Sequence, residues 1–227
     1  MWGKLIAVAT LLYAAVYGCY RRHLTALGER CLRQPEDQDW KHGDVLIVAN
    51  RSIRRTLQFM LLRPLGWALT GTAFVHPLLV LERQGRKYVL HFYKEPYTPE
   101  GEPLCPRMQT AATRTGVYVS LLDDFLRRQA VAYDVVLEVW RSPTFPASTQ
   151  TYDAVLAKAN RACGQPFSVL PGVLPGLHCI AFMAILLHQL GYFGHLSSQE
   201  VLAQATPGSF QRLLESSSFR RIHTWCA

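Results

Sequence analysis

The 227-residue chain lacks the sequence signatures of several common protein classes. Its six cysteines have no CxxC spacing, which argues against a structural zinc site and against a dense disulfide framework. It has no zinc-finger, helix-turn-helix or RNA-binding motif, so we expect no nucleic-acid partner. Internal repeats and low-complexity segments are also missing. Only 18% of the residues are charged and 49% are hydrophobic, which excludes both a disordered chain and a wholly intramembrane one.

What the chain has in excess is positive charge, with 24 Lys and Arg residues against 16 Asp and Glu residues. Much of this excess is arginine in short clusters, at 21–22, 51–55, 127–128 and 220–221. Basic clusters suit an anionic membrane surface as readily as nucleic acid. Because no nucleic-acid motif accompanies them, we favour the membrane.

The N-terminal segment MWGKLIAVATLLYAAVYGCY is apolar apart from Lys4, and Arg21-Arg22-His23 follows directly. The apolar run approaches the roughly 20 residues that a bilayer core requires. A cleaved signal peptide is the alternative, but its stronger positive charge would precede the apolar run. We therefore predict a single-pass membrane anchor at residues 1–23, with the main domain on the cytosolic-equivalent side.

A polar, partly helical connector is predicted at residues 24–42, followed by one α+β domain at 43–227. The predicted domain is an antiparallel sheet with helices packed on it. Strands are expected at 45–48, 72–81, 87–92 and 133–140, with a hairpin turn at Gln84-Gly85. Helices are expected at 53–69, 117–128, 152–163 and 179–190, with shorter ones capped by Ser197 and Thr206, and a loop at 96–106.

Cys179 follows Pro175-Gly176 and begins the apolar helix that is predicted at 179–190. The positive end of a helix macrodipole favours a thiolate at such a position. A nucleophilic cysteine also needs a base, usually histidine, and often a third group that orients the histidine. His76 and His91 lie in the two strands of the predicted hairpin, where they can lie close together. These three residues are therefore candidates for a thiol-dependent site.

Other interpretations of these residues stay open. A cysteine in an apolar helix is most often a small buried hydrophobe, and a strand histidine is most often a hydrogen-bonded core residue. His178 is a weak candidate base, because adjacent side chains of a helix point apart. His76, His91 and Cys179 could also hold zinc, with water in the fourth position. We favour a Cys/His pair over a metal site and predict no metal and no cofactor.

The order of the segments GDVLIV, FVHPLLVLE, YVLHF, HCIAFMAILLHQLG and TPGSF resembles the circularly permuted papain-like fold of the NlpC-type superfamily. This group includes YiiX-like amidases, a poxviral relative and the lecithin–retinol acyltransferase family. In its members a Gly-Asp strand and a His-bearing strand precede the Cys-bearing helix, and a Thr/Ser-Pro segment follows. Asp44 and Thr206-Pro207 match the outer parts of this pattern, and the resemblance covers roughly residues 43 to 210.

The resemblance implies that Cys179 is the nucleophile, His76 its base and His91 the third, orienting residue. It also implies acyl transfer or hydrolysis through a thioester, with the backbone N–H of Cys179 contributing to an oxyanion hole. His178 stands where the acyltransferases often have Asn.

The sequence therefore predicts a membrane-anchored thiol hydrolase or acyltransferase that acts on an amide or ester of a peptide or lipid. The alternative is a catalytically inactive papain-like domain that serves as an accessory or structural subunit of a membrane assembly. The expected partners are the membrane through the N-terminal helix, a lipid or peptide substrate, and other proteins of such an assembly.

Overall fold

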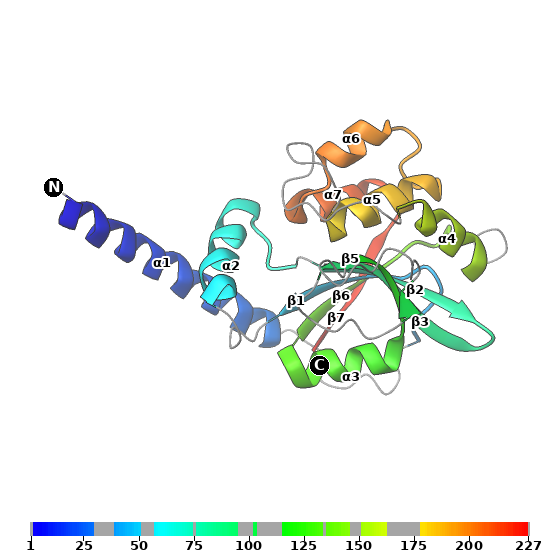
Figure 1. The fold of residues 1–227 in the computed structure, drawn as a ribbon, viewed down its shortest axis with the longest axis horizontal. Helices are drawn as coiled ribbons and strands as arrows, with labels where there is room; N and C mark the ends of the chain where they lie inside the picture. Colours follow the sequence, from blue (N-terminus) through cyan, green and yellow to red (C-terminus); the bar gives the residue numbers. More distant parts are fainter. Residues whose placement is uncertain are drawn as a thin grey trace.

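The computed structural model describes residues 2–29, 39–50, 57–74, 76–94, 102–103, 115–133, 135–145, 151–162 and 178–226. Within these residues an antiparallel sheet has helices on both faces (Figure 1), which confirms the predicted α+β class. The first residues of the predicted helix Ile53–Leu69 lie outside the described ranges. Most of the predicted loop at 96–106 also lies outside them.

The strands of the described residues form a seven-stranded sheet in the order β4-β5-β3-β2-β1-β6-β7, with every neighbouring pair antiparallel. Their bounds are β1 Val45–Asn50, β2 His76–Arg83, β3 Arg86–Lys94, β4 Glu102–Pro103, β5 Thr115–Leu121, β6 Val135–Arg141 and β7 Arg220–Cys226. The central strands β1, β2 and β6 are buried along most of their length, which explains their nearly continuous hydrophobic sequences.

The helices are α1 Trp2–Glu29, α2 Leu57–Thr70, α3 Leu122–Tyr133, α4 Tyr152–Ala159, α5 Cys179–Gln189, α6 Ser198–Ala203 and α7 Pro207–Ser216. A 3-10 turn, Asn160–Ala162, follows α4. Helices α4 to α7 lie on one side of the sheet and α3 lies on the other (Figure 1). Because side chains alternate along a strand, the sheet supports two hydrophobic clusters, one on each face.

Local sequence signals explain several element boundaries. The hairpin turn between β2 and β3 places Gln84 and Gly85 at φ values of 52° and 73°, as a two-residue hairpin turn requires. Ser197 and Glu200 form a reciprocal capping box at the start of α6. Gly191 ends α5 with a φ of 95°. The predicted hairpin, the cap of α6 and the end of α5 are therefore confirmed.

A partly buried ion pair joins the residue before β1 to the end of β6. The Asp44 carboxylate is fully buried and accepts hydrogen bonds from Arg141 Nε at 2.7 Å and from Arg141 Nη2 at 2.8 Å. It also accepts one from the backbone N–H of Lys41 at 2.8 Å. The Gly-Asp element of the sequence therefore fixes the start of β1 against the end of β6.

The predicted helix at 117–128 is wrong over its first half, where the chain forms β5 as far as Leu121. In β5 the side chains of Val117 and Val119 face the larger hydrophobic cluster, as strand alternation demands. The helix α3 begins only at Leu122, so Asp123 and Asp124 lie in its first turn rather than in its middle. Carboxylates are favourable in a first turn because they face the positive end of the macrodipole.

Besides β5, the strands β4 and β7 have no counterpart in the sequence prediction. β4 is two residues long and falls within the predicted loop at 96–106. β7 pairs with β6 at the edge of the sheet, and its residues Arg220, Arg221 and His223 are exposed. Charged residues on an edge strand protect its unpaired edge from aggregation. They also remove the hydrophobic alternation from which a strand is predicted.

The N-terminal helix α1 extends away from the sheet, with α2 alongside it (Figure 1). It continues to Glu29, and its C-terminal half joins the core through the buried side chains of Tyr20 and Leu24. The sequence predicts a membrane-spanning helix at residues 1–23, but no helix in the described part of the chain combines the length and apolarity needed to cross a bilayer.

Candidate functional site

The β2–β3 hairpin brings the two candidate histidines together. His76 is the first residue of β2, and His91 lies near the far end of β3. His76 Nε2 and His91 Nδ1 are 3.4 Å apart, and the two rings are almost perpendicular, with centroids 5.5 Å apart. One ring nitrogen donates and the other accepts, according to the tautomer. The contact with His91 orients the half-buried His76 ring.

His91 is the more deeply placed of the two, with 3% of its surface exposed. Its ring lies 5.4 Å from the ring of Phe125 in α3 and 6.1 Å from the ring of Tyr118 in β5. Burial, and secondarily the neighbouring His76, lower the pKa of His91 well below its ordinary value. His91 is therefore a neutral imidazole at physiological pH, suited to orienting His76 rather than to carrying charge.

Cys179 is the first residue of α5, as the sequence predicts, and His178 is its N-cap residue. The Nδ1 atom of His178 accepts a hydrogen bond from the backbone N–H of Ala181 at 2.9 Å. This bond satisfies one of the donors that a helix N-terminus leaves unpaired. His178 therefore holds the turn that carries Cys179, and its Nδ1 lone pair is used as an acceptor rather than as a base.

The expected effect of the helix terminus on Cys179 is outweighed by burial. Burial raises the pKa of the Cys179 thiol to about 12, although the backbone N–H groups of Cys179 and Ile180 act in the opposite direction. The helix N-terminus therefore lowers the thiol pKa as predicted, but burial raises that pKa by more, so the predicted thiolate is wrong. At rest, Cys179 is a protonated thiol.

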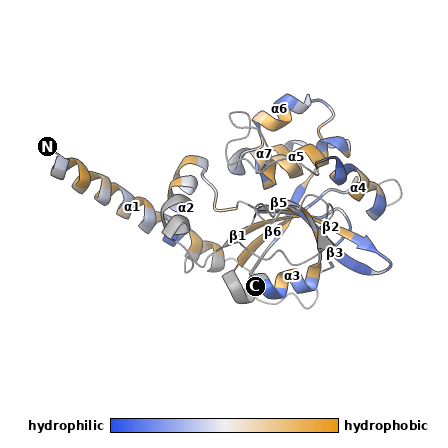
Figure 2. Cartoon of the chain, in the orientation of Figure 1, coloured by the Kyte–Doolittle hydropathy of each residue, from blue (hydrophilic) through white to orange (hydrophobic). Residues whose placement is uncertain are grey.

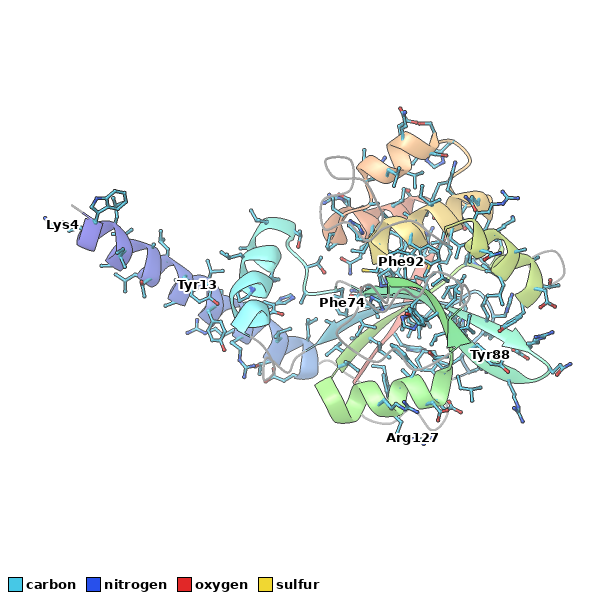
Figure 3. The ribbon with its side chains drawn as sticks, in the orientation of Figure 1. Lys4, Tyr13, Phe74, Tyr88, Phe92 and Arg127 are labelled. Atoms are coloured by element: carbon cyan, nitrogen blue, oxygen red, sulfur yellow. The ribbon has the colours of Figure 1, made fainter. Side chains whose placement is uncertain are left out.

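Helix α5 packs on the two strands that carry the histidines. Phe182, one turn after Cys179, stacks on Phe92 of β3 with ring centroids 5.4 Å apart and an interplanar angle of 26°. Phe92, labelled in Figure 3, lies next to His91 in the sequence and just beneath α5. The first turn of α5 is thus positioned over the end of the hairpin at which β2 starts and β3 finishes.

Strand alternation, however, separates the faces on which these groups lie. Cys179 packs against the larger cluster, which holds Leu90 and Phe92, on the α5 side of the sheet. His91 is two residues after Val89 in β3, so both side chains point to the same face of the sheet. Val89 belongs to the smaller cluster on the α3 side. His76 and His91 therefore contact each other on the α3 side of the sheet, whereas Cys179 and the larger cluster lie on the α5 side.

The described residues contain no group of three or more His, Cys, Asp or Glu side chains arranged to hold a metal ion. The zinc alternative for His76, His91 and Cys179 thus has no support in the described geometry. Cys19 and Cys179 are both reduced thiols, Cys19 exposed and Cys179 half-buried.

The structural roles of two polar residues, His178 and Glu138, were not predicted from the sequence. His178 is an N-cap, and its signal was its place directly before the apolar helix. The second is Glu138, a buried carboxylate in β6 that no hydrophobic pattern predicts. It accepts hydrogen bonds from Gln211 at 2.6 Å, Arg221 at 3.1 Å and Trp140 at 3.2 Å.

No family model, no curated protein and no solved structure matches this chain. The resemblance to the permuted papain-like group thus stays a prediction drawn from short sequence motifs.

Proposed function

We propose that this protein is a thiol hydrolase or acyltransferase that acts on an amide or ester of a peptide or lipid. The observation that carries the proposal is the 3.4 Å contact between His76 Nε2 and His91 Nδ1, on a hairpin over which the Cys179 helix packs. Nucleophilic catalysis by cysteine requires a thiol and a base that a second polar group orients.

In the proposed reaction, the His76 imidazole removes the proton of the Cys179 thiol while the sulfur attacks the carbonyl carbon of the substrate. The resulting oxyanion accepts a hydrogen bond from the backbone N–H of Cys179. Collapse of this intermediate expels the amine or alcohol, which takes the proton from His76 and leaves a thioester. Water or an acceptor alcohol or amine then attacks the thioester, with His76 again accepting and returning a proton, and the thiol is restored.

The raised pKa of Cys179 and the lowered pKa of His91 support a neutral resting site rather than a preformed ion pair. Proton transfer then accompanies attack, so the thiol is activated only when a substrate is bound. The proposal requires the His76 ring to reach Cys179 around the start of β2. In the structure His76 contacts His91 on the α3 face of the hairpin, so its ring has to leave that contact for the proton transfer to take place.

The test is acyl transfer from activated esters to the full chain, with one fatty-acyl and one N-acylpeptidyl donor. We expect an acyl adduct on Cys179, detected by peptide-resolved mass spectrometry and released by hydroxylamine, as a thioester is. Cys179→Ala should abolish the adduct, whereas Cys19→Ala, at the exposed thiol, should retain it. His76→Asn should slow acylation by about 100-fold or more, which is the usual contribution of a general base.

An adduct that forms on Cys19 alone, or that persists in Cys179→Ala, would exclude the proposed nucleophile. The two donors separate the substrate classes, since preferential acylation by the fatty-acyl ester indicates a lipid substrate and the reverse indicates a peptide.

A non-catalytic accessory domain is the second candidate, and two observations favour it. The pKa of the Cys179 thiol is raised to about 12. Cys179 also packs on the face of the hairpin opposite that of His91. On this hypothesis His76 and His91 form a structural pair within the smaller core. No acyl donor would then modify Cys179, and His76→Asn would change stability without changing any reaction.

A further inference from the structure

The N-terminal half of α1 carries an apolar surface that the rest of the described chain does not cover. Residues 4–12 are all exposed. The large apolar side chains and their exposed fractions are Trp2 77%, Leu5 56%, Ile6 65%, Val8 54%, Leu11 71% and Leu12 64%. Hydrophobic residues run along this projecting part of the helix in Figure 2, and Lys4 lies near its free end in Figure 3. Such a surface needs an apolar partner.

The distribution of these side chains around the helix indicates what the partner is. At about 100° per residue, the six positions spread over roughly 220° of the circumference. A protein groove or a second helix covers a stripe of about 100°. A second copy of α1 would therefore leave much of this surface in water, whereas hydrocarbon surrounds an inserted helix on every side.

The charge along the helix fits the same partner. Arg21 and Arg22 are exposed, about 15 Å beyond Leu12 at 1.5 Å per residue. Tyr13 and Tyr17 lie between the two regions, half-buried and in contact, with ring centroids 6.3 Å apart. From Trp2 to Arg22 the helix is first apolar, then aromatic and then basic. This is the order of hydrocarbon, interface and anionic headgroups in one leaflet.

The other end of α1 is fixed to the body of the protein. Tyr20 and Leu24 are each 2% exposed, and the Tyr20 ring lies 5.9 Å from the ring of Trp67 in α2. The C-terminal end of the helix is therefore packed against the body of the protein. Its apolar part, Trp2–Leu12, is about 16 Å long, roughly half the thickness of a bilayer core.

We propose that the Trp2–Leu12 part of α1 inserts into a lipid bilayer, with Arg21 and Arg22 at anionic headgroups of the same leaflet. This insertion does not depend on thiol chemistry at Cys179. It holds the sheet and its hairpin at a membrane surface whether or not the domain is an enzyme.

The test is flotation of the full chain with vesicles of phosphatidylcholine alone and of phosphatidylcholine with about one-third phosphatidylserine. We expect binding to both, and tighter binding to the anionic vesicles. Ile6→Glu with Leu11→Glu should lower the partition coefficient by at least about 100-fold, because each change removes a large apolar side chain and adds a charge. The matched control is Leu69→Glu, which changes an 87% exposed leucine of α2 and should leave binding unchanged.

Two further measurements locate the contact. Arg21→Glu with Arg22→Glu should remove the preference for anionic vesicles while retaining binding to neutral ones. Brominated lipids should quench tryptophan fluorescence of the wild type more than that of Trp2→Phe. The proposal is overturned if the wild type does not float or if the Ile6/Leu11 variant floats equally well. Lipid-free oligomers that the same variant disperses, without vesicle binding, would assign the surface to a second copy of the chain.

Discussion

The resting state of the Cys179 thiol leads to a quantitative prediction about its reactivity. Alkylation by iodoacetamide proceeds through the thiolate, so its rate follows the ionised fraction. With a pKa raised from the ordinary 9.0 to about 12, about one Cys179 thiol in ten thousand is ionised near pH 8, against about one in ten for an ordinary thiol. We therefore expect Cys179 in the folded chain to be alkylated about a thousandfold more slowly than in the chain unfolded in urea.

Peptide-resolved mass spectrometry after timed alkylation measures this rate at Cys179 separately from the other cysteines. The rate in the folded chain should keep rising with pH up to about pH 10, with no plateau. A plateau with a midpoint below pH 9 would refute the burial argument and would indicate a thiolate stabilised by a nearby imidazolium. Slow alkylation combined with rapid acylation by an ester donor is the result that a neutral, substrate-activated pair requires.

Three further predictions concern the framework of the fold. Asp44→Ala should cost about 2–3 kcal/mol in urea denaturation, because it removes the carboxylate that accepts from the partly buried Arg141 and from the Lys41 N–H, and Asp44→Ala with Arg141→Met should recover part of the loss. A single variant as stable as wild type would contradict this. Gly208→Ala should cost about 1–3 kcal/mol, because a Cβ at this position would clash with the backbone oxygen of Thr70. An unchanged midpoint of urea denaturation would show that α2 and α7 can move apart without loss of stability. His178→Ala should cost about 1 kcal/mol at neutral pH, and His178→Asn much less. Burial lowers the pKa of His178 in the folded chain, so the neutral cap contributes stability above the ordinary pKa and loses it as the pH falls through the lowered value. The Ala variant and wild type should therefore converge in acid, and a constant difference between them would contradict this.

Elements with strong local signals were predicted well from the sequence. The strand Val45–Asn50, the β2–β3 hairpin and the start of α5 at Cys179 all follow from hydrophobic runs bounded by glycine or proline. The segment 117–128 was predicted wrongly because a strand and a helix meet there without a break, and a single amphipathic pattern fits both. β7 was missed because edge strands carry exposed polar residues.

At the candidate site, the sequence identified residues but not their energetics. The Cys179 pKa could not be predicted, because burial of a helix terminus depends on what packs over it, and here that effect exceeds the local backbone contribution. The cap formed by His178 was recognisable in principle, since histidine Nδ1 presents an acceptor much as an Asn side chain does.

The sequence by itself determines that His76 and His91 share a face. The two-residue turn at Gln84-Gly85 sets the register of the hairpin, and strand alternation then places both side chains on the same side. Only the tertiary structure decides which helix covers that face, because the choice depends on how α3 and α5, far apart in the chain, divide the two sides of one sheet. Local rules fix the periodicity of a strand, whereas the side that each helix covers is set by the packing of the whole core.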